Sequence, residues 1–153
     1  MVLAATIALG VTAVPAATSA RAGTDKTGAK PTVSVATTAV GPLLVNRAQD
    51  TIYMWVRDKR DKDKCLSVKK CEKDWPAVTT PTKPIAGPGV KKSLLGAIPY
   101  KGPHKGKLYE VTYKGHPLHT YLFDTGKRSV INIGNRQFGG AWYALNAAGG
   151  VVK

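Results

Sequence analysis

The sequence is poor in acidic residues, cysteines and helical patterns, and each shortage narrows the classes of protein that fit it. It has 9 Asp and Glu against 23 Lys and Arg, and only two cysteines. After the apolar N-terminal stretch, no segment longer than about ten residues has helical periodicity. The chain also lacks a nucleophile elbow, a paired-carboxylate signature and a phosphate-binding loop. We therefore expect a mostly β protein that is not an enzyme and holds no cofactor.

The excess of positive charge points to anionic partners. The formal net charge is +14 at pH 7, and such a surface attracts polyanions. The basic residues are scattered and form neither a helical stripe nor an aromatic RNA-binding signature, so nucleic acid is not expected as the natural partner. Outside the cell, the anionic candidates are envelope polymers, lipid headgroups and acidic polysaccharides. The alternative is a soluble basic protein without a polyanionic ligand.

Residues 1–22 are predicted to be an export signal. Residues 1–20 carry no charge, are dominated by Ala, Val, Leu and Thr, and end in small residues. The candidate cleavage sites are Thr18-Ser19-Ala20 and Ala20-Arg21-Ala22. A short membrane anchor is the alternative, but Gly10 and Pro15 disfavour it. No cysteine follows the apolar run, so we expect a secreted or envelope-associated protein without a lipid anchor.

The remaining chain is long enough for one domain. Residues 23–39 are rich in Thr, Ala, Gly and Lys and are predicted to be a flexible linker. Within them, Val33 and Val35 alternate with polar residues and can form an edge strand. Residues 40–153 are predicted to be a single β-rich domain.

Two stretches of this domain, residues 52–58 and 118–124, match at a constant offset of 66 residues. In each stretch a polar ring precedes an aromatic residue by two positions, and an aspartate follows three residues later. The matched residues are Tyr53 and His119, Trp55 and Tyr121, and Asp58 and Asp124. Trp75 and Trp142 form a further pair downstream. We interpret this as an internal duplication, with repeat one at residues 40–79 and repeat two at 107–146.

Alternating apolar residues predict short antiparallel strands within each repeat. Residues 43–45 and 52–56 are predicted to form a hairpin, with Tyr53 and Trp55 on one covered face and Ile52 and Met54 on the other. In the second repeat we expect a strand at 108–113, a turn at Lys114-Gly115, a return strand at 116–123 and a last strand at 141–145. Residues 93–98 are a further candidate strand, and the charged segment 59–74 can contain a helical turn.

Cys65 and Cys71 are predicted to form a structural disulfide. An even number of cysteines in an exported chain is typical of disulfide pairing. Their spacing fits neither the usual zinc sites nor a Cys-x-x-Cys redox pair. The predicted fold is therefore a single compact domain of antiparallel hairpins built from two diverged repeats, sandwich or barrel-like, with a disulfide-stapled loop.

These motifs resemble a bacterial family of secreted or lipoprotein repeats of unknown function. The family motif is Tyr-x-aromatic-x-x-Asp, matched by Tyr53, Trp55 and Asp58, and followed here by the cysteine pair and Trp75-Pro76. Residues 113–118 and 139–143 resemble the family's later segments. His119 departs from the family pattern, because a tyrosine is expected there. The resemblance implies no established activity.

The repeated motif is the candidate ligand-binding site. Aromatic rings and carboxylates together suit sugar stacking or cation capture, and the candidate residues are Tyr53, Trp55, Asp58, His119, Tyr121 and Asp124. The alternative is that these residues form the core and shape equivalent turns.

His116, His119 and Asp124 are candidate metal ligands. Residues three apart on a strand point to opposite faces, so no metal site is expected there. The predicted function is non-catalytic binding of anionic envelope or extracellular material. A small-ligand, metal or redox-associated protein that uses the repeated motif is the alternative.

Overall fold

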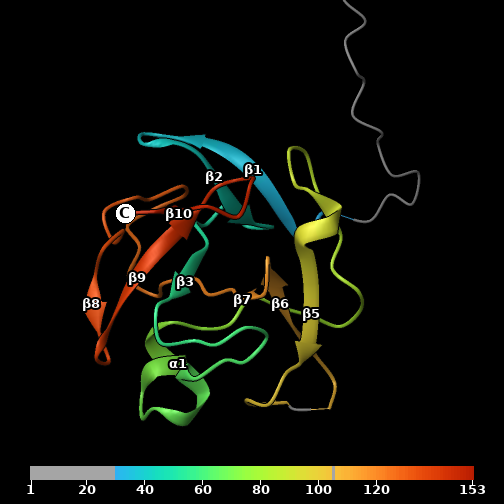
Figure 1. Cartoon of the computed structure of the whole chain (residues 1–153), viewed down its shortest axis with the longest axis vertical. Coiled ribbons are helices and arrows are strands. Elements are labelled where there is room, and N and C mark those ends of the chain that lie inside the picture. The colour runs from blue at the N-terminus through green and yellow to red at the C-terminus, as the bar shows by residue number, and fades with distance from the viewer. Residues whose placement is uncertain (1–29, 105) are drawn as a thin grey trace, which may run out of the picture.

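Antiparallel strands dominate residues 30–104 and 106–153, which are the part described by the computed structural model (Figure 1). The predicted mostly β class is confirmed. The strands are β1 (Val33–Thr38), β2 (Gly41–Asn46), β3 (Tyr53–Trp55), β4 (Thr79–Thr80), β5 (Leu95–Pro99), β6 (Tyr109–Tyr113), β7 (His116–Pro117), β8 (Arg136–Gln137), β9 (Gly140–Leu145) and β10 (Val151–Val152). The helical pieces are α1 (Cys71–Asp74) and the 3-10 turns Cys65–Ser67 and Lys92–Leu94. In these ranges, no helix has the length and hydrophobicity needed to cross a membrane.

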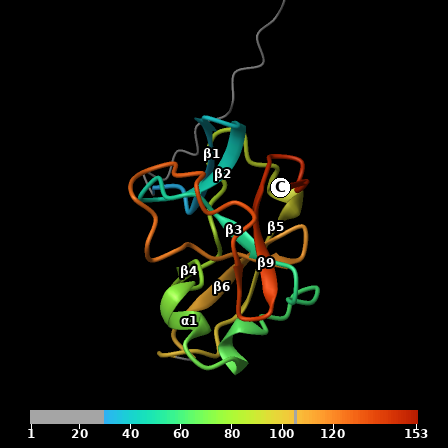
Figure 2. The same cartoon turned by 90° about the vertical axis from the view of Figure 1, so that its left-hand side faces the viewer.

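The strands form three small sheets. β1 pairs with β2; β3 and β10 flank β9, which also pairs with β8; and β4 and β5 flank β6, which also pairs with β7. None of the sheets built by the described residues closes into a barrel. Both views place the β1–β2 hairpin at one end of the molecule and α1 at the opposite end (Figures 1 and 2).

The two predicted repeats pair with each other through their backbones. The Tyr53 amide donates to the His119 carbonyl at 2.8 Å, and the His119 amide donates back to Tyr53 at 2.9 Å. Beyond this bridge, β3 pairs with β9 of repeat two, so that Trp55 faces Trp142. On the other side of the bridge, His119 faces Ala77 of repeat one. On both sides of the bridge, therefore, a segment of one repeat pairs with a segment of the other.

The side chains of β3 divide between two buried clusters, as the period-two pattern predicted. Ile52 and Met54 belong to an aliphatic cluster with residues from β1, β2, β6 and β9. Tyr53 and Trp55 belong to an aromatic cluster that also contains the two cysteines. Every side chain of β3 is buried because one cluster covers each of its faces.

The predicted disulfide is present, and it lies in the core. Cys65 and Cys71 are bonded to each other and are both fully buried within the aromatic cluster. The 3-10 turn and α1 that contain them account for the helical turn expected in the charged segment. Closing so short a loop stabilises the fold by roughly 2 kcal/mol in the chain-entropy treatment.

The predicted linker extends too far, because β1 lies inside it. β1 pairs with β2 along its whole length, and Val33 is fully buried in the aliphatic cluster. The edge strand considered at Val33 and Val35 is thus confirmed, and the folded part begins before Val40. The linker prediction was wrong because the small residues around β1 are also typical of linkers. The burial of Val33 depends instead on contacts with the 85–87 loop, which is distant in the sequence. The predicted export signal lies outside the described residues.

Two strand boundaries in the second repeat also differ from prediction. The turn at Lys114-Gly115 is confirmed, with φ of 52° and 82° as a two-residue hairpin requires. The return strand, however, is regular only over β7, because Pro117 has no N–H for a longer ladder. The strand at 141–145 is β9, but it is not the last, since β10 adds to its edge.

A substitution at Gly140 tests how tightly the aromatic cluster is packed. A Cβ at this position would lie 2.5 Å from Trp55 Nε1, and the buried indole cannot move aside. We expect Gly140→Ala to lower the free energy of unfolding by about 1–3 kcal/mol, measured by urea denaturation. An unchanged midpoint would contradict this packing. Gly126→Ala is the comparison variant. A Cβ at Gly126 meets open space, so this substitution introduces backbone strain at a φ of 144° without a steric clash.

Candidate functional site

Four aromatic rings from the two repeats form one continuous stack. Trp55 stacks on Trp142 with ring centroids 5.2 Å apart, Trp142 on Trp75 at 4.0 Å, and Trp75 on Tyr121 at 4.1 Å. Rings of repeat one and repeat two alternate along the stack. The matched pair Trp75 and Trp142 lies in the middle, and the matched pair Trp55 and Tyr121 lies at the ends. An approximate twofold relation between the repeats therefore passes through the centre of the stack.

The two polar rings of the motif make matching edge contacts with this stack. Tyr53 meets Trp75 at 5.3 Å with an interplanar angle of 86°. His119 meets Trp142 at 5.1 Å with an angle of 88°. Such edge-to-face contacts are favourable for aromatic rings. Because matched residues make matched contacts, the geometry supports the internal duplication.

The motif aspartates are exchanged between the repeats. The Tyr53 hydroxyl of repeat one donates to Asp124 of repeat two, 3.0 Å from Oδ2. His119 of repeat two lies 3.0 Å from Asp58 Oδ2 of repeat one. Each polar ring thus bonds to the aspartate of the other copy. These crossed pairs hold the two repeats together from both sides of the stack.

The six predicted ligand-binding residues all belong to this core arrangement: four of them form the two crossed pairs, and Trp55 and Tyr121 lie at opposite ends of the stack. Tyr53, Trp55 and His119 are fully buried, and the Asp58 side chain is only 2% exposed. Tyr121 and Asp124 are half-buried. No open aromatic face is available on the buried rings for stacking a sugar. This geometry favours the alternative interpretation, in which the motif builds the core.

Each aspartate also orders the loop that follows its strand. Asp58 Oδ1 accepts the Lys64 amide at 2.8 Å, as expected for an aspartate at a strand end. Asp124 Oδ1 accepts the Asn132 side-chain amide at 2.7 Å. Burial raises the pKa of Asp124, while these hydrogen bonds oppose the shift. Burial and the adjacent Asp124 raise the pKa of Tyr53, so its hydroxyl stays a donor.

His119 is held as an imidazolium. Its Nδ1 lies 3.2 Å from the Trp75 carbonyl oxygen, and its Nε2 faces Asp58. Both partners are acceptors, so both ring nitrogens carry a proton. Burial alone lowers the pKa of His119. The hydrogen bond to Asp58 and the charges of Asp58, Asp63 and Glu110 outweigh it and raise the pKa to about 9.

Sequence reasoning missed a set of buried acids around His119, namely Asp63, Glu72 and Glu110. Glu110 on β6 is 1% exposed, and its Oε1 has no hydrogen-bond partner. Burial, followed by the charge of Asp63, raises the pKa of Glu110 to about 8. Burial also raises the pKa of Asp63 and of Glu72, which accepts the Tyr100 hydroxyl. The only sequence signal for these acids was Glu110, which lies among β-forming residues in the predicted strand at 108–113.

The three metal-ligand candidates considered in the sequence do not meet. His119 pairs with Asp58, and Asp124 pairs with Tyr53. Among the described residues, the clusters whose spacing suits a metal ion are Asp58, Asp63 and His119, and Cys65, Glu72 and His119. Cys65 is in the disulfide and cannot supply a thiolate.

The fold and the crossed motif define a disulfide-containing β protein whose two repeats share one core. Residues 34–79 match a family model described as a secreted repeat of unknown function. The resemblance is thereby confirmed over the first copy and through its Trp75-Pro76 segment. No significant match is found among curated proteins or among solved structures.

A double-mutant cycle tests the crossed pairs. Tyr53→Phe removes the hydroxyl that bonds to Asp124, and Asp124→Asn weakens the same bond from the other side. We expect each variant to lose about 1–2 kcal/mol of unfolding free energy. The double variant should lose less than the sum, with a coupling of about 0.5 kcal/mol or more. Additive losses in chemical denaturation would show that the pair contributes nothing as a pair.

The buried charges predict that stability falls as pH rises. The pKa of Glu110 is raised from 4.5 to about 8, and that of His119 from 6.5 to about 9. Between each pair of values the folded state binds more protons than the unfolded state, so the free energy of unfolding decreases with pH. We expect the melting temperature to decline from about pH 5 to pH 9.

Glu110→Gln tests the assignment, because it removes the carboxyl group while keeping its size. The decline between pH 4.5 and 8 should become shallower in this variant. Asp61→Asn is the matched control, since Asp61 is exposed. Identical pH profiles for the two variants would show that Glu110 does not carry the effect.

Proposed function

We propose that this protein is an exported, non-catalytic module that binds anionic polymers of the cell envelope or its surroundings. The proposal rests on one observation, the segregation of charge between the interior and the surface. In the described ranges every Lys and Arg is exposed except Lys64, which is half-buried. Of the acids in the same ranges, Asp61 is exposed, Glu110 is buried and the other six are half-buried. The fully exposed charges in these ranges are therefore almost all positive.

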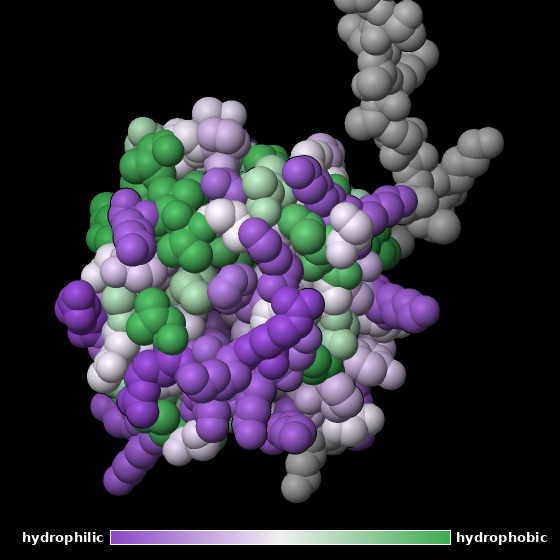
Figure 3. All heavy atoms as spheres, viewed as in Figure 1, coloured by the Kyte–Doolittle hydropathy of each residue, from purple (hydrophilic) through white to green (hydrophobic). Residues whose placement is uncertain are grey.

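Lysines gather around two adjoining pockets near α1, of about 680 and 480 Å³. The pockets share Leu66, Ser67 and Lys101 as lining residues. Figure 3 shows hydrophilic residues over the corresponding lower part of the molecule. We call the lysines that line these pockets the basic face: Lys62, Lys69, Lys70, Lys73 and Lys101.

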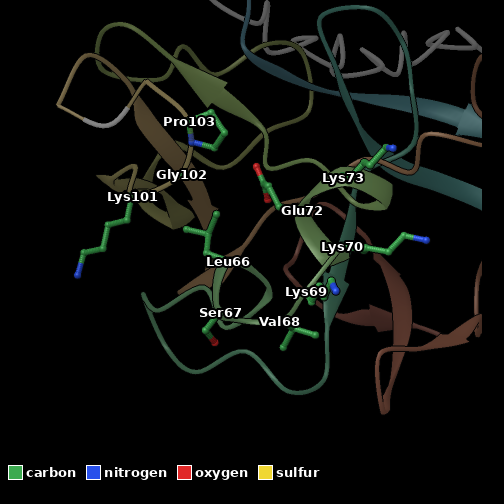
Figure 4. A pocket seen from close by; sticks show the side chains of 10 residues that line it. All are labelled: Leu66, Ser67, Val68, Lys69, Lys70, Glu72, Lys73, Lys101, Gly102 and Pro103. Atoms are coloured by element: carbon green, nitrogen blue, oxygen red, sulfur yellow. The ribbon is translucent and has the colours of Figure 1, made fainter.

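The lysines of the basic face point in different directions. Figure 4 shows that Lys101 extends to one side of the larger pocket and that Lys70 and Lys73 extend to the opposite side, while Glu72 lies between them. Diverging ammonium groups do not enclose one small anion. They suit a chain of phosphates or carboxylates that passes over several of them. A polymer is therefore favoured over a single small anion.

The alternative functions have less support from the geometry. The motif residues expected to stack on a sugar or other organic ligand contact one another across the repeat interface instead. His119 is fully buried, and both of its ring nitrogens have partners, which disfavours a role as a general base. The family matched by the first copy is a secreted one, which is consistent with an anionic extracellular partner.

Co-sedimentation over a salt series tests this proposal. The chain without residues 1–20 is mixed with purified anionic wall polymer, and anionic vesicles are used in parallel. We expect binding to the polymer at low ionic strength and steep loss as salt rises, because exposed charges are screened over about 10 Å at 0.1 M. Binding that persists at high salt, or that is absent at low salt, would contradict the proposal.

A pair of matched variants locates the surface. Substituting Lys69, Lys70 and Lys73 by Gln should weaken polymer binding by roughly a hundredfold, on the scale of about 1 kcal/mol per lysine near an anionic surface. Substituting Lys83, Lys127 and Lys153 removes equal charge, but none of these residues lines either pocket. Equal losses in the two variants would show that the basic face has no special role.

A further inference from the structure

We propose that the buried His119 cluster binds a divalent transition-metal cation, with His119 Nε2 and the carboxylates of Asp58 and Asp63 as ligands. Asp63 also lines the smaller pocket of the basic face, but the proposal does not depend on polymer binding. One potential ligand atom from each residue lies within 4.8 Å of the other two. The three residues come from both repeats, so only the folded protein assembles them.

The spacing between His119 and Asp58 suits a shared metal ion. Nε2 and Oδ2 are 3.0 Å apart. Bonds from a zinc ion to nitrogen or carboxylate oxygen are about 2.0–2.2 Å long, so two ligand atoms of a tetrahedral zinc ion lie roughly 3.4 Å apart. A metal ion can therefore take the place of the bridging proton once the two side chains move apart by roughly 0.4 Å.

The other ring nitrogen is already arranged as in metal-binding histidines. Nδ1 donates its proton to the Trp75 carbonyl oxygen at 3.2 Å. A histidine that binds a metal through one nitrogen usually donates the other N–H to a carbonyl or carboxylate, which fixes the ring orientation. The contact of the ring with Trp142 restrains it further. Nε2 is thus held toward Asp58 and Asp63.

One of the proposed ligands has a buried oxygen without a hydrogen-bond partner. Asp63 Oδ1 accepts the Cys65 amide at 2.6 Å, but its Oδ2 is buried without a hydrogen-bond partner. Glu110, 1% exposed, also has a buried oxygen without a partner. Such oxygens cost free energy unless something compensates them. A cation beside Asp63 Oδ2 would do so.

A pocket adjoins one of the proposed ligands. Asp63 and Glu110 both line the cavity of about 480 Å³ beside β5, whereas Asp58 and His119 do not. We therefore expect a cation to reach the cluster from the side of Asp63. Mixed imidazole and carboxylate ligands suit zinc and its neighbours, whereas calcium and magnesium prefer oxygen ligands alone.

Binding of the cation releases one proton. The cation displaces the Nε2 proton of the His119 imidazolium, which leaves to solvent, while Nδ1 keeps its proton. The ligands are then one neutral imidazole and two carboxylates, whose charges offset that of the cation. The equivalent position in the other crossed pair is occupied by Tyr53, a poor ligand for such an ion while protonated. The site therefore exists on one side of the repeat interface only.

Equilibrium dialysis with zinc chloride tests the proposal. Chelator-treated protein lacking residues 1–20 should retain one zinc ion per chain and should not retain magnesium. Long-range nitrogen–proton NMR of the histidines should show a large shift of His119 Nε2 on zinc addition. The signals of His104 and His116 should stay in place.

Asp63→Asn is the informative variant, because an amide keeps the oxygen that caps the loop and removes the carboxylate. We expect it to weaken zinc binding at least tenfold, while Asp61→Asn, an exposed neighbour, leaves it unchanged. Circular dichroism checks that both variants are folded. The proposal is overturned if Asp63→Asn binds zinc as Asp61→Asn does, if zinc leaves His119 Nε2 unshifted, or if His104→Gln or His116→Gln abolishes binding.

Discussion

The crossed pairing of two rings with two aspartates is the constraint on which the rest of the structure depends. Tyr53 and His119 pair through their backbones, and each side chain bonds to the aspartate of the other copy. This arrangement places the two copies in opposite directions and sets their tryptophans face to face. Neither repeat alone can complete the aromatic stack or satisfy its own motif. The two predicted repeats therefore share one core.

Position 119 is a histidine where the first copy has Tyr53, and this difference makes the two halves chemically unequal. On one side of the stack a neutral phenol donates to Asp124. On the other side a buried imidazolium faces Asp58, with further acids close enough to raise its pKa. Of these acids, Glu110 is buried and Asp63 is half-buried, whereas the described lysines and arginines are exposed except for Lys64. The same buried charge thus links the core, the basic surface behind the proposed function and the cluster proposed to bind a metal ion.

Much of the fold could be predicted because it is encoded in local patterns. Period-two alternation identified β3 and the division of its side chains between two faces. Gly115 marked a tight hairpin turn, and the two cysteines indicated a disulfide. The prediction of β1 as linker was wrong because its burial depends on a loop fifty residues downstream. Strand ends in repeat two were misplaced for a similar reason, since edge pairing is decided by neighbours in space.

Local and periodic sequence patterns were enough to predict the β class, the disulfide and the matched motif residues. These features follow from spacing and periodicity, which act over a few residues or repeat at a constant offset. The sequence did not indicate that each motif ring takes the other copy's aspartate, nor that Asp63 and Glu110 come to lie near His119. Hydrogen bonding and desolvation depend on contacts between separate segments, and the one-dimensional pattern does not specify those contacts.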